Sequence, residues 1–250
     1  MRILLTNDDG IHALGICALY EALRDDHEIF LVAPDSERSA VGHAITLVDP
    51  LRARKVRRNG GFFGWALSGT PADCVKLGCR ELIDGPVDMV VSGINLGANT
   101  GINVLYSGTV SAATEGTILG IRSAAFSLDT FQDPNYCFAA SFAGDIVNWF
   151  GSLELERPVA LNVNIPSLPP ARISGVRVVR QDTSQPAEDF DKRIDPRGNV
   201  YYWQADQNLD GSASSDTDRS ALGSGFITIT PIRFDLTDHE LLGALAPPGI

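Results

Sequence analysis

The sequence predicts an α/β fold: a Rossmann-like, mainly parallel sheet flanked by helices, with a β-rich C-terminal extension. Over residues 1–166, short apolar runs alternate with segments whose apolar residues recur every three or four positions, which is typical of strand–helix–strand units. Later strand-like runs are instead separated by polar loops. The chain has 250 residues, 44% of them hydrophobic, and is long enough to bury a core without disulfide or metal staples. We therefore expect a core over residues 1–166 and an extension over residues 167–250, within one compact domain.

The elements of the core follow from local patterns. Continuous apolar runs predict strands over Arg2–Thr6 and residues 28–33, 65–67, 87–91 and 124–128. Helical spacing predicts a helix carrying Leu14, Cys17, Leu19, Tyr20 and Leu23, and others over residues 111–119 and 136–150. A further helix should begin at Pro71, which suits a first helical position, with Thr70 as its N-cap.

The extension predicts strands over residues 176–179, 200–203 and 226–232. The last of these alternates apolar and polar residues, as a half-exposed antiparallel strand does. Residues 206–224 are rich in Asp, Ser and Gly, and we expect a loop or a mobile arm there.

The charge balance restricts the partners of the chain. Twenty basic and 31 acidic residues give a net charge of −11, which repels a polyanion, so we expect no DNA or RNA partner. No apolar run approaches the roughly 18 residues of a membrane span, and acids occur too early for a secretory signal. We expect a cytoplasmic protein with no membrane partner.

Two adjacent carboxylates follow the first predicted strand, in Thr6-Asn7-Asp8-Asp9-Gly10. In open α/β sheets, ligands bind at the carboxyl ends of the strands. Asp8 and Asp9 repel each other there, and a divalent cation would relieve that repulsion. The structural alternative is a simple Asp-Gly turn. Helical periodicity after Gly10, rather than a returning strand, favours a functional role.

Three later loops could complete such a site. Residues 33–43 form a polar loop that contains Ser39, and residues 92–103 alternate Gly with Asn, including Asn95 and Asn99. Ser107-Gly108-Thr109 stands at a predicted helix N-terminus, where free amides favour a phosphate. Each has a structural alternative: a polar loop, a Gly/Asn loop and an ordinary N-cap, respectively.

Several nucleotide-enzyme and hydrolase motifs are absent from the sequence. It has no GxGxxG after the first strand, no GxxxxGK[ST], no GxSxG and no HExxH. These absences disfavour a dinucleotide enzyme, a P-loop NTPase and a serine hydrolase of the α/β type.

Taken together, the motifs resemble those of the survival-protein SurE family of metal-dependent nucleotidases. The matching stretches occur in order along nearly the whole chain: residues 7–11, 32–39, 68–75, 92–99, 106–110, 161–166 and 225–231. Two positions depart from the usual pattern, because Arg38 and Ala40 flank Ser39 where the family more often has Gln and Gly. Neither departure removes a liganding atom.

The resemblance implies one divalent cation per subunit, Mg²⁺ or Mn²⁺, bound by Asp8, Asp9, Ser39 and Asn95. These hard oxygen ligands suit either ion better than Zn²⁺. It also implies phosphate contacts from Ser107, Gly108 and Thr109, with Asn99 lining the pocket.

The implied protein is a 5′(3′)-nucleotidase that hydrolyses nucleoside monophosphates. It would form a homodimer or homotetramer through its C-terminal segment. Two alternatives stay open: a haloacid-dehalogenase-like phosphatase with an aspartyl nucleophile, and a non-catalytic nucleotide-binding module. The first requires Asp-x-Asp, whereas Gly10 stands two residues after Asp8.

Overall fold

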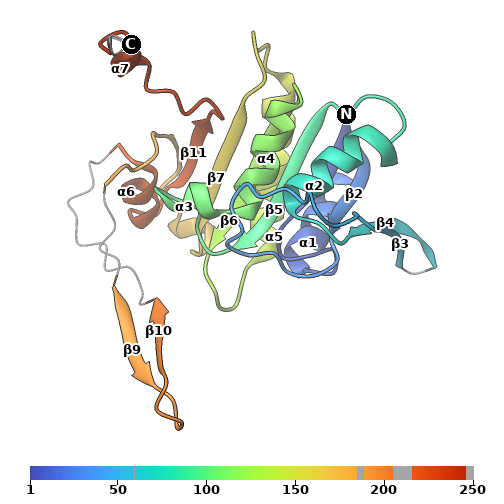
Figure 1. Ribbon diagram of the computed structural model, residues 1–250. Helices are drawn as coiled ribbons and strands as arrows, with labels where there is room; N and C mark the ends of the chain where they lie inside the picture. Colours follow the sequence, from blue (N-terminus) through green and yellow to red (C-terminus); the bar gives the residue numbers. More distant parts are fainter. Residues whose placement is uncertain (59, 185–188, 205–215, 246–250) are drawn as a thin grey trace.

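The computed structural model describes residues 1–58, 60–184, 189–204 and 216–245, and its centre is a nine-stranded sheet (Figure 1). The strand order across this sheet is β3-β4-β2-β1-β5-β6-β7-β11-β8. The strands are β1 (Arg2–Thr6), β2 (Glu28–Pro34), β3 (Ala53–Arg58), β4 (Gly61–Leu67), β5 (Met89–Leu96), β6 (Arg122–Asp129), β7 (Ala160–Pro166), β8 (Val176–Val178) and β11 (Ile227–Ile232). All neighbours pair in parallel except β3 with β4 and β7 with β11. The predicted mainly parallel α/β fold is therefore confirmed.

Helices cover both faces of the sheet (Figure 1). The longer ones are α1 (Leu14–Leu23), α2 (Pro71–Leu77), α4 (Gly108–Ile118) and α5 (Tyr136–Ser152). α1 packs with α5, and α2 packs with α4. Side chains alternate along β1, so Ile3 and Leu5 join the core that contains α1 and α5, while Leu4 joins the core with α2 and α4.

Shorter helical elements complete the chain: α3 (Asn103–Tyr106), α6 (Asp218–Gly223), α7 (His239–Leu242), a π-helical turn (Gly78–Leu82) and a 3₁₀ turn (Pro170–Arg172). The predicted N-cap of α2 is confirmed, since the Thr70 hydroxyl accepts from the Asp73 amide and the Asp73 carboxylate accepts from the Thr70 amide. No helix among the described residues has the length and apolarity needed to cross a membrane.

Some strands differ from the sequence prediction. β3, β7 and β9 (Phe190–Ile194) were not predicted. β5 continues to Leu96, so Asn95 lies in a strand rather than in the predicted Gly/Asn loop. The pairing of β5 with β6 shifts register between Ser92 and Asn95. Ser92, Gly93 and Asn95 also break the apolar run there, so the sequence does not show that the strand continues.

Two predictions in the extension are wrong. β11 pairs antiparallel with β7, as predicted, but it is not half-exposed: it lies between β7 and β8, and Thr228 and Thr230 are at most 2% exposed. The alternation arises because both faces of β11 are buried, and one of them carries the side chains of Thr228 and Thr230. The expected loop over residues 206–224 contains α6, capped by Thr217, whose hydroxyl accepts from the Ser220 amide. Residues 206–215 of that prediction lie outside the described residues.

β9 and β10 (Val200–Gln204) form a separate two-stranded antiparallel sheet that projects from the main body (Figure 1). Every residue of both strands is exposed. Two of them, Phe190 and Gln204, pair with each other across the sheet and line a cavity in the main body.

Candidate active site

The acidic pair lies on a tight turn that follows β1. Asn7 is fully buried and fixes this turn: its side-chain amide donates to the Gly10 carbonyl at 3.0 Å, and its oxygen accepts from the Gly10 amide at 3.2 Å. Gly10 has φ +99°, and a Cβ there would come within 3.3 Å of the Ser36 backbone. The turn therefore needs Gly10 and places Asp8 and Asp9 at the carboxyl edge of the sheet.

Asp8 is packed against the N-terminus of α4. Its carboxylate accepts a hydrogen bond from the Thr109 hydroxyl, and the residue is 4% exposed. A Cβ on Gly108 would lie 2.8 Å from the Asp8 Cβ, so only glycine permits this approach. Ser107 caps α4 by accepting from the Val110 amide. The Ser-Gly-Thr motif thus opens a helix, as predicted.

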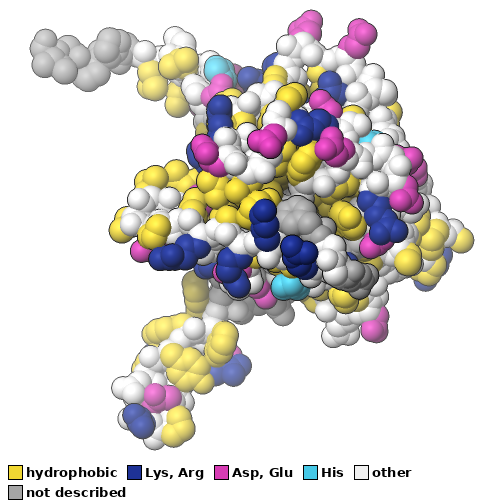
Figure 2. Space-filling model, turned by 90° about the vertical axis from the view of Figure 1, so that its right-hand side faces the viewer, with side chains coloured by type: hydrophobic (Ala, Val, Ile, Leu, Met, Phe, Trp, Pro, Cys, Tyr) yellow, Lys and Arg dark blue, Asp and Glu magenta, His cyan; other side chains and the backbone are white. Residues whose placement is uncertain are grey.

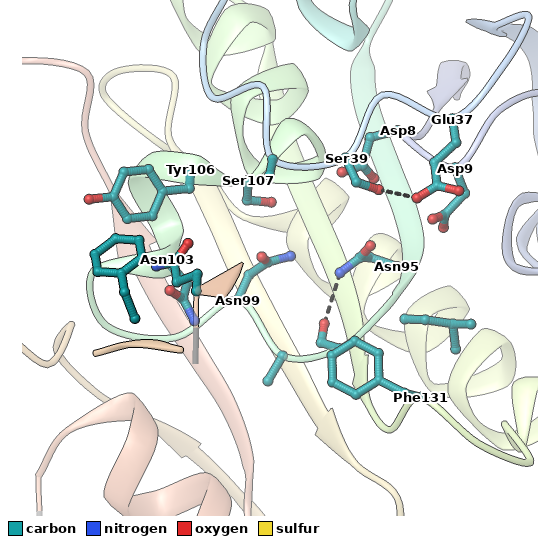
Figure 3. Close-up of a pocket in the computed structure, with 16 residues that line it drawn as sticks. Asp8, Asp9, Glu37, Ser39, Asn95, Asn99, Asn103, Tyr106, Ser107 and Phe131 are labelled. Carbon is teal, nitrogen blue, oxygen red and sulfur yellow. Dashed lines mark hydrogen bonds between the residues drawn. The ribbon is translucent and has the colours of Figure 1, made fainter. Parts of the chain in front are cut away.

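The loop after β2 carries Ser39 to the same edge. The Arg38 amide donates to the Asp8 carbonyl at 2.7 Å, which ties this loop to the acidic turn. The Ser39 hydroxyl donates to the Glu37 carboxylate at 2.7 Å, and both face Asp8 and Asp9 in Figure 3. No role for Glu37 is predicted from the sequence. Its position two residues before Ser39, in the same loop, was the available signal.

Asn95 and Asn99 reach the site from the end of β5 and the loop after it. The Asn95 amide nitrogen donates to the Gly97 carbonyl at 2.8 Å, which leaves its side-chain oxygen free to face the acids (Figure 3). The Asn99 amide nitrogen donates to the Ser127 hydroxyl at 2.8 Å. Each side chain is thereby held in one orientation.

These residues line a cavity of about 930 Å³. Asp8, Asp9, Ser39, Asn95, Asn99 and Ser107, all predicted site residues, contribute to its wall. Gly108 and Thr109 are buried beside Asp8 and do not line it. Asn103, Tyr106 and Phe131 also line the cavity but were not singled out, because side chains of these types are common in loops (Figure 3).

The electrostatics of the site are those of uncompensated negative charge. Burial raises the pKa of Asp8, although hydrogen bonds from Thr109 oppose the rise. Burial, together with the charges of Asp8 and Glu37, raises the pKa of Asp9 to about 7. Among the described residues, no Lys, Arg or His forms an ion pair with Asp8, Asp9 or Glu37. The site therefore favours binding of a positive charge.

Comparison with known proteins identifies the family. The family model described as "Survival protein SurE" matches residues 3–188. A protein of Syntrophobacter fumaroxidans named "5'-nucleotidase SurE" is 52% identical over 98% of both chains. A protein of the same name from Syntrophus aciditrophicus is 53% identical over 98% of this chain and 92% of its own. The chain belongs to the SurE family.

A solved structure supports the same assignment. The crystal structure of the SurE protein from Aquifex aeolicus superposes with a TM-score of 0.86, at 39% identity, and covers 98% of both chains. The resemblance stated from the motifs is thus confirmed, and so is the fold class.

The donor set suits the divalent cation that the SurE family implies. Asp8 and Asp9 offer carboxylate oxygens, Ser39 a hydroxyl and Asn95 an amide oxygen, all hard ligands. Within the described chain, no three His, Cys, Asp or Glu side chains converge on one point. A cation here would therefore depend on the hydroxyl and the amide as well as on the acidic pair. Because the Ser39 hydroxyl donates to Glu37, its lone pairs stay free to ligate.

Proposed function

We propose that this SurE-family chain is a metal-dependent phosphomonoesterase, a 5′(3′)-nucleotidase that hydrolyses nucleoside monophosphates to nucleoside and phosphate. The observation that carries the proposal is the unpaired acidic turn at the carboxyl edge of the sheet, set against the N-terminus of α4 inside a cavity of about 930 Å³. The relatives' name, 5'-nucleotidase, supports it.

We assign Asp8, Asp9, Ser39 and Asn95 as ligands of one Mg²⁺ or Mn²⁺ ion. When bound, such a cation acts as a Lewis acid and lowers the pKa of a coordinated water. Asp8 is fixed by Thr109, whereas Asp9 is partly exposed, so we assign proton exchange with solvent to Asp9.

The phosphate would lie in the cavity, beside the acidic turn and the Ser107 cap of α4. At the N-terminus of this helix the amides of Gly108 and Thr109 favour an anion through hydrogen bonds and the helix dipole, whereas the Ser107 amide already donates to the Asn103 carbonyl at 3.0 Å. The Asn99 side chain lines the same cavity and would contact the phosphate or the sugar. The sugar hydroxyl is then the leaving group. Cytoplasmic localisation stays a prediction.

The two alternatives make different demands on the site. A haloacid-dehalogenase-like phosphatase requires a second acid at position 10, where Gly10 has φ +99°, a backbone conformation that strains any other residue. A non-catalytic nucleotide-binding module requires no reaction at all.

The test is a phosphate-release screen over nucleoside monophosphates and an aryl phosphate, with Mg²⁺, Mn²⁺ or chelator. We expect activity only with metal, unchanged folding in chelator, and near-complete loss in Asp8→Asn. Asp145→Asn, an exposed acid on α5, is the matched control. Full activity at zero metal content would reject the cation, a trapped aspartyl-phosphate would favour the dehalogenase mechanism, and no release from any substrate would favour the binding module.

We also propose self-association, as a homodimer or homotetramer, through the C-terminal segment. An isolated two-stranded hairpin is marginally stable in water, yet β9–β10 projects alone and carries hydrophobic side chains (Figures 1 and 2). These exposed residues are Phe190, Ile194, Val200, Tyr201, Tyr202 and Trp203. A second copy of the chain would cover them and remove an aggregation hazard.

A second apolar surface supports the same proposal. A groove of about 860 Å³ lies between α4 and β11, and its lining includes Val104, Ile118, Val178 and Ile232. The nearby α7 leaves Leu241 and Leu242 exposed. Deleting the C-terminal segment would also remove β11 from the main sheet, so point substitutions are the better test of self-association. We expect Tyr202→Ser/Trp203→Ser to lower the mass measured by light scattering, and an unchanged mass would reject the hairpin as the contact.

A further inference from the structure

The backbone of Asn99 is held by two asparagines of β7. The Asn99 amide donates to the Asn164 side-chain oxygen at 2.7 Å. Its carbonyl accepts from the side-chain amides of Asn162, at 2.7 Å, and Asn164, at 3.1 Å. Both asparagines are fully buried. Burying polar side chains in a sheet is unfavourable unless they are hydrogen-bonded, and here most of their bonds go to one residue of the site loop.

The backbone of Gly101, two residues further along the loop, is held by Asp218 of α6 and by Gln181. The Gly101 amide donates to the Asp218 carboxylate at 3.0 Å, and the Gly101 carbonyl accepts from the Gln181 side chain at 2.7 Å. Asp218 is fully buried and also accepts from the amides of Asp182, at 3.0 Å, and Arg219, at 2.7 Å. Three backbone donors therefore satisfy this carboxylate.

These bonds determine how the loop faces the cavity. With its backbone fixed on both sides, Asn99 directs its side chain toward Ser127 and the cavity. The chain then continues through α3 to Ser107, the N-cap of α4, which also lines the cavity. None of Asn162, Asn164, Gln181 and Asp218 lines the cavity. They can act on a bound nucleotide only through the loop that they hold.

We propose that Asn164 and Asp218 are positioning residues of the nucleotide site, which fix the backbone on either side of Thr100 and so orient Asn99 and the start of α4. The inference rests on the proposed nucleotidase function and deepens it. It links the C-terminal part of the chain, through α6, to the catalytic edge formed by the N-terminal half.

The test uses substitutions that preserve size. Asn164→Asp replaces one of the two donors to the Asn99 carbonyl with an oxygen. Asp218→Asn places an amide group against one of its backbone donors. We expect kcat to fall at least about tenfold in each, while stabilisation by Mn²⁺ alone stays as in the wild type, because Asp8 and Asp9 are untouched. Gln181→Met is a milder variant outside the core, and we expect a fall of two- to fivefold.

Thr228→Val is the matched control. Thr228 pairs with Asn164 in register, is equally buried, and its hydroxyl has no hydrogen-bond partner within the described structure. We expect its kcat to equal that of the wild type. A purely structural role of Asn164 and Asp218 predicts lower melting temperatures with an unchanged kcat for the folded fraction, and that result would overturn the proposal.

Hydrogen exchange gives a readout that does not depend on activity. In the wild type the amides of Asn99 and Gly101 should be protected. Asn164→Leu removes the acceptor of the Asn99 amide and Asp218→Asn disturbs that of the Gly101 amide, so each amide should exchange at least about tenfold faster in the corresponding variant. Unchanged exchange would reject the proposal even if activity fell. An inactive wild type would reject the proposed function, and the exchange rates would still decide whether these residues hold the loop.

Discussion

Replacing Asp9 by Asn should stabilise the metal-free protein at neutral pH. Burial and the neighbouring charges of Asp8 and Glu37 raise the pKa of Asp9 from 3.8 to about 7. Between these two values the folded protein holds a proton that the unfolded chain releases. The contribution of Asp9 to stability therefore falls as the pH rises through this window, and it is least favourable above pH 7.

The size of the effect follows from the same pKa. A rise from 3.8 to about 7, at about 1.36 kcal/mol per pH unit, corresponds to at most about 4 kcal/mol. Asp9 is partly exposed, so water reduces both the cost of its burial and the repulsion from Asp8 and Glu37. We expect Asp9→Asn to exceed the wild type by about 2 kcal/mol in unfolding free energy at pH 8, and by almost nothing at pH 4.

The assay is denaturant unfolding in chelator from pH 4 to pH 8, with Asp145→Asn as the control acid. In the presence of Mn²⁺ we expect the order of stability to reverse, with the wild type more stable than Asp9→Asn. At one hundred times its dissociation constant, Mn²⁺ should stabilise the wild type by about 2.7 kcal/mol, whereas Asp9→Asn should gain much less and lose most phosphate release. A stability difference that does not change between pH 4 and pH 8 would show that burial and the charges of Asp8 and Glu37 do not destabilise the ionised Asp9.

Three further substitutions test other parts of the site. Asn95→Ala should lower phosphate release at least about tenfold while the lost bond to Gly97 costs only about 1 kcal/mol of stability, and near-normal activity would make this amide structural. Gly108→Ala should cost about 1–3 kcal/mol in denaturant unfolding, because its Cβ would lie 2.8 Å from that of Asp8; unchanged stability would contradict the packing. His43→Gln should cost about 1 kcal/mol at pH 7 in thermal unfolding, because His43 pairs with the buried Glu115 at 2.7 Å, and a variant as stable as the wild type would show that this pair contributes nothing.

The pH dependence of the last variant has a definite sign. Burial raises the pKa of Glu115, but hydrogen bonds and charges from His43 and Lys76 outweigh it and lower the pKa below 4.5. The stability that this group contributes is present above pH 4.5 and is lost as the pH falls through its folded value. The deficit of His43→Gln should therefore shrink as the pH falls below 4.5 and Glu115 takes up a proton.

The parts of the fold that were predicted are those with local signals. A continuous apolar run identified β1, and the acids that follow it are separated from it by a single residue, Asn7. Parallel strands bring their carboxyl ends to one edge, so this order along the chain already placed Asp8, Asp9 and Ser39 together. β7 was missed because one of its two buried faces carries Asn162 and Asn164, which break the apolar pattern expected of a central strand.

The remaining errors have the same physical origin. The bond from Gly101 to Asp218 joins residues 117 positions apart, and those from Asn99 to β7 span 63 and 65 positions. Nothing in the local pattern of β11 indicates that its threonines lie in the same buried polar rows as the asparagines of β7, yet the register pairs Thr230 with Asn162. The residues that give the site its charge, Asp8 and Asp9, can thus be predicted from the sequence because they follow the end of a strand. Residues that hold the geometry of the site are buried polar side chains in distant elements, and only the tertiary structure shows which backbone groups they satisfy.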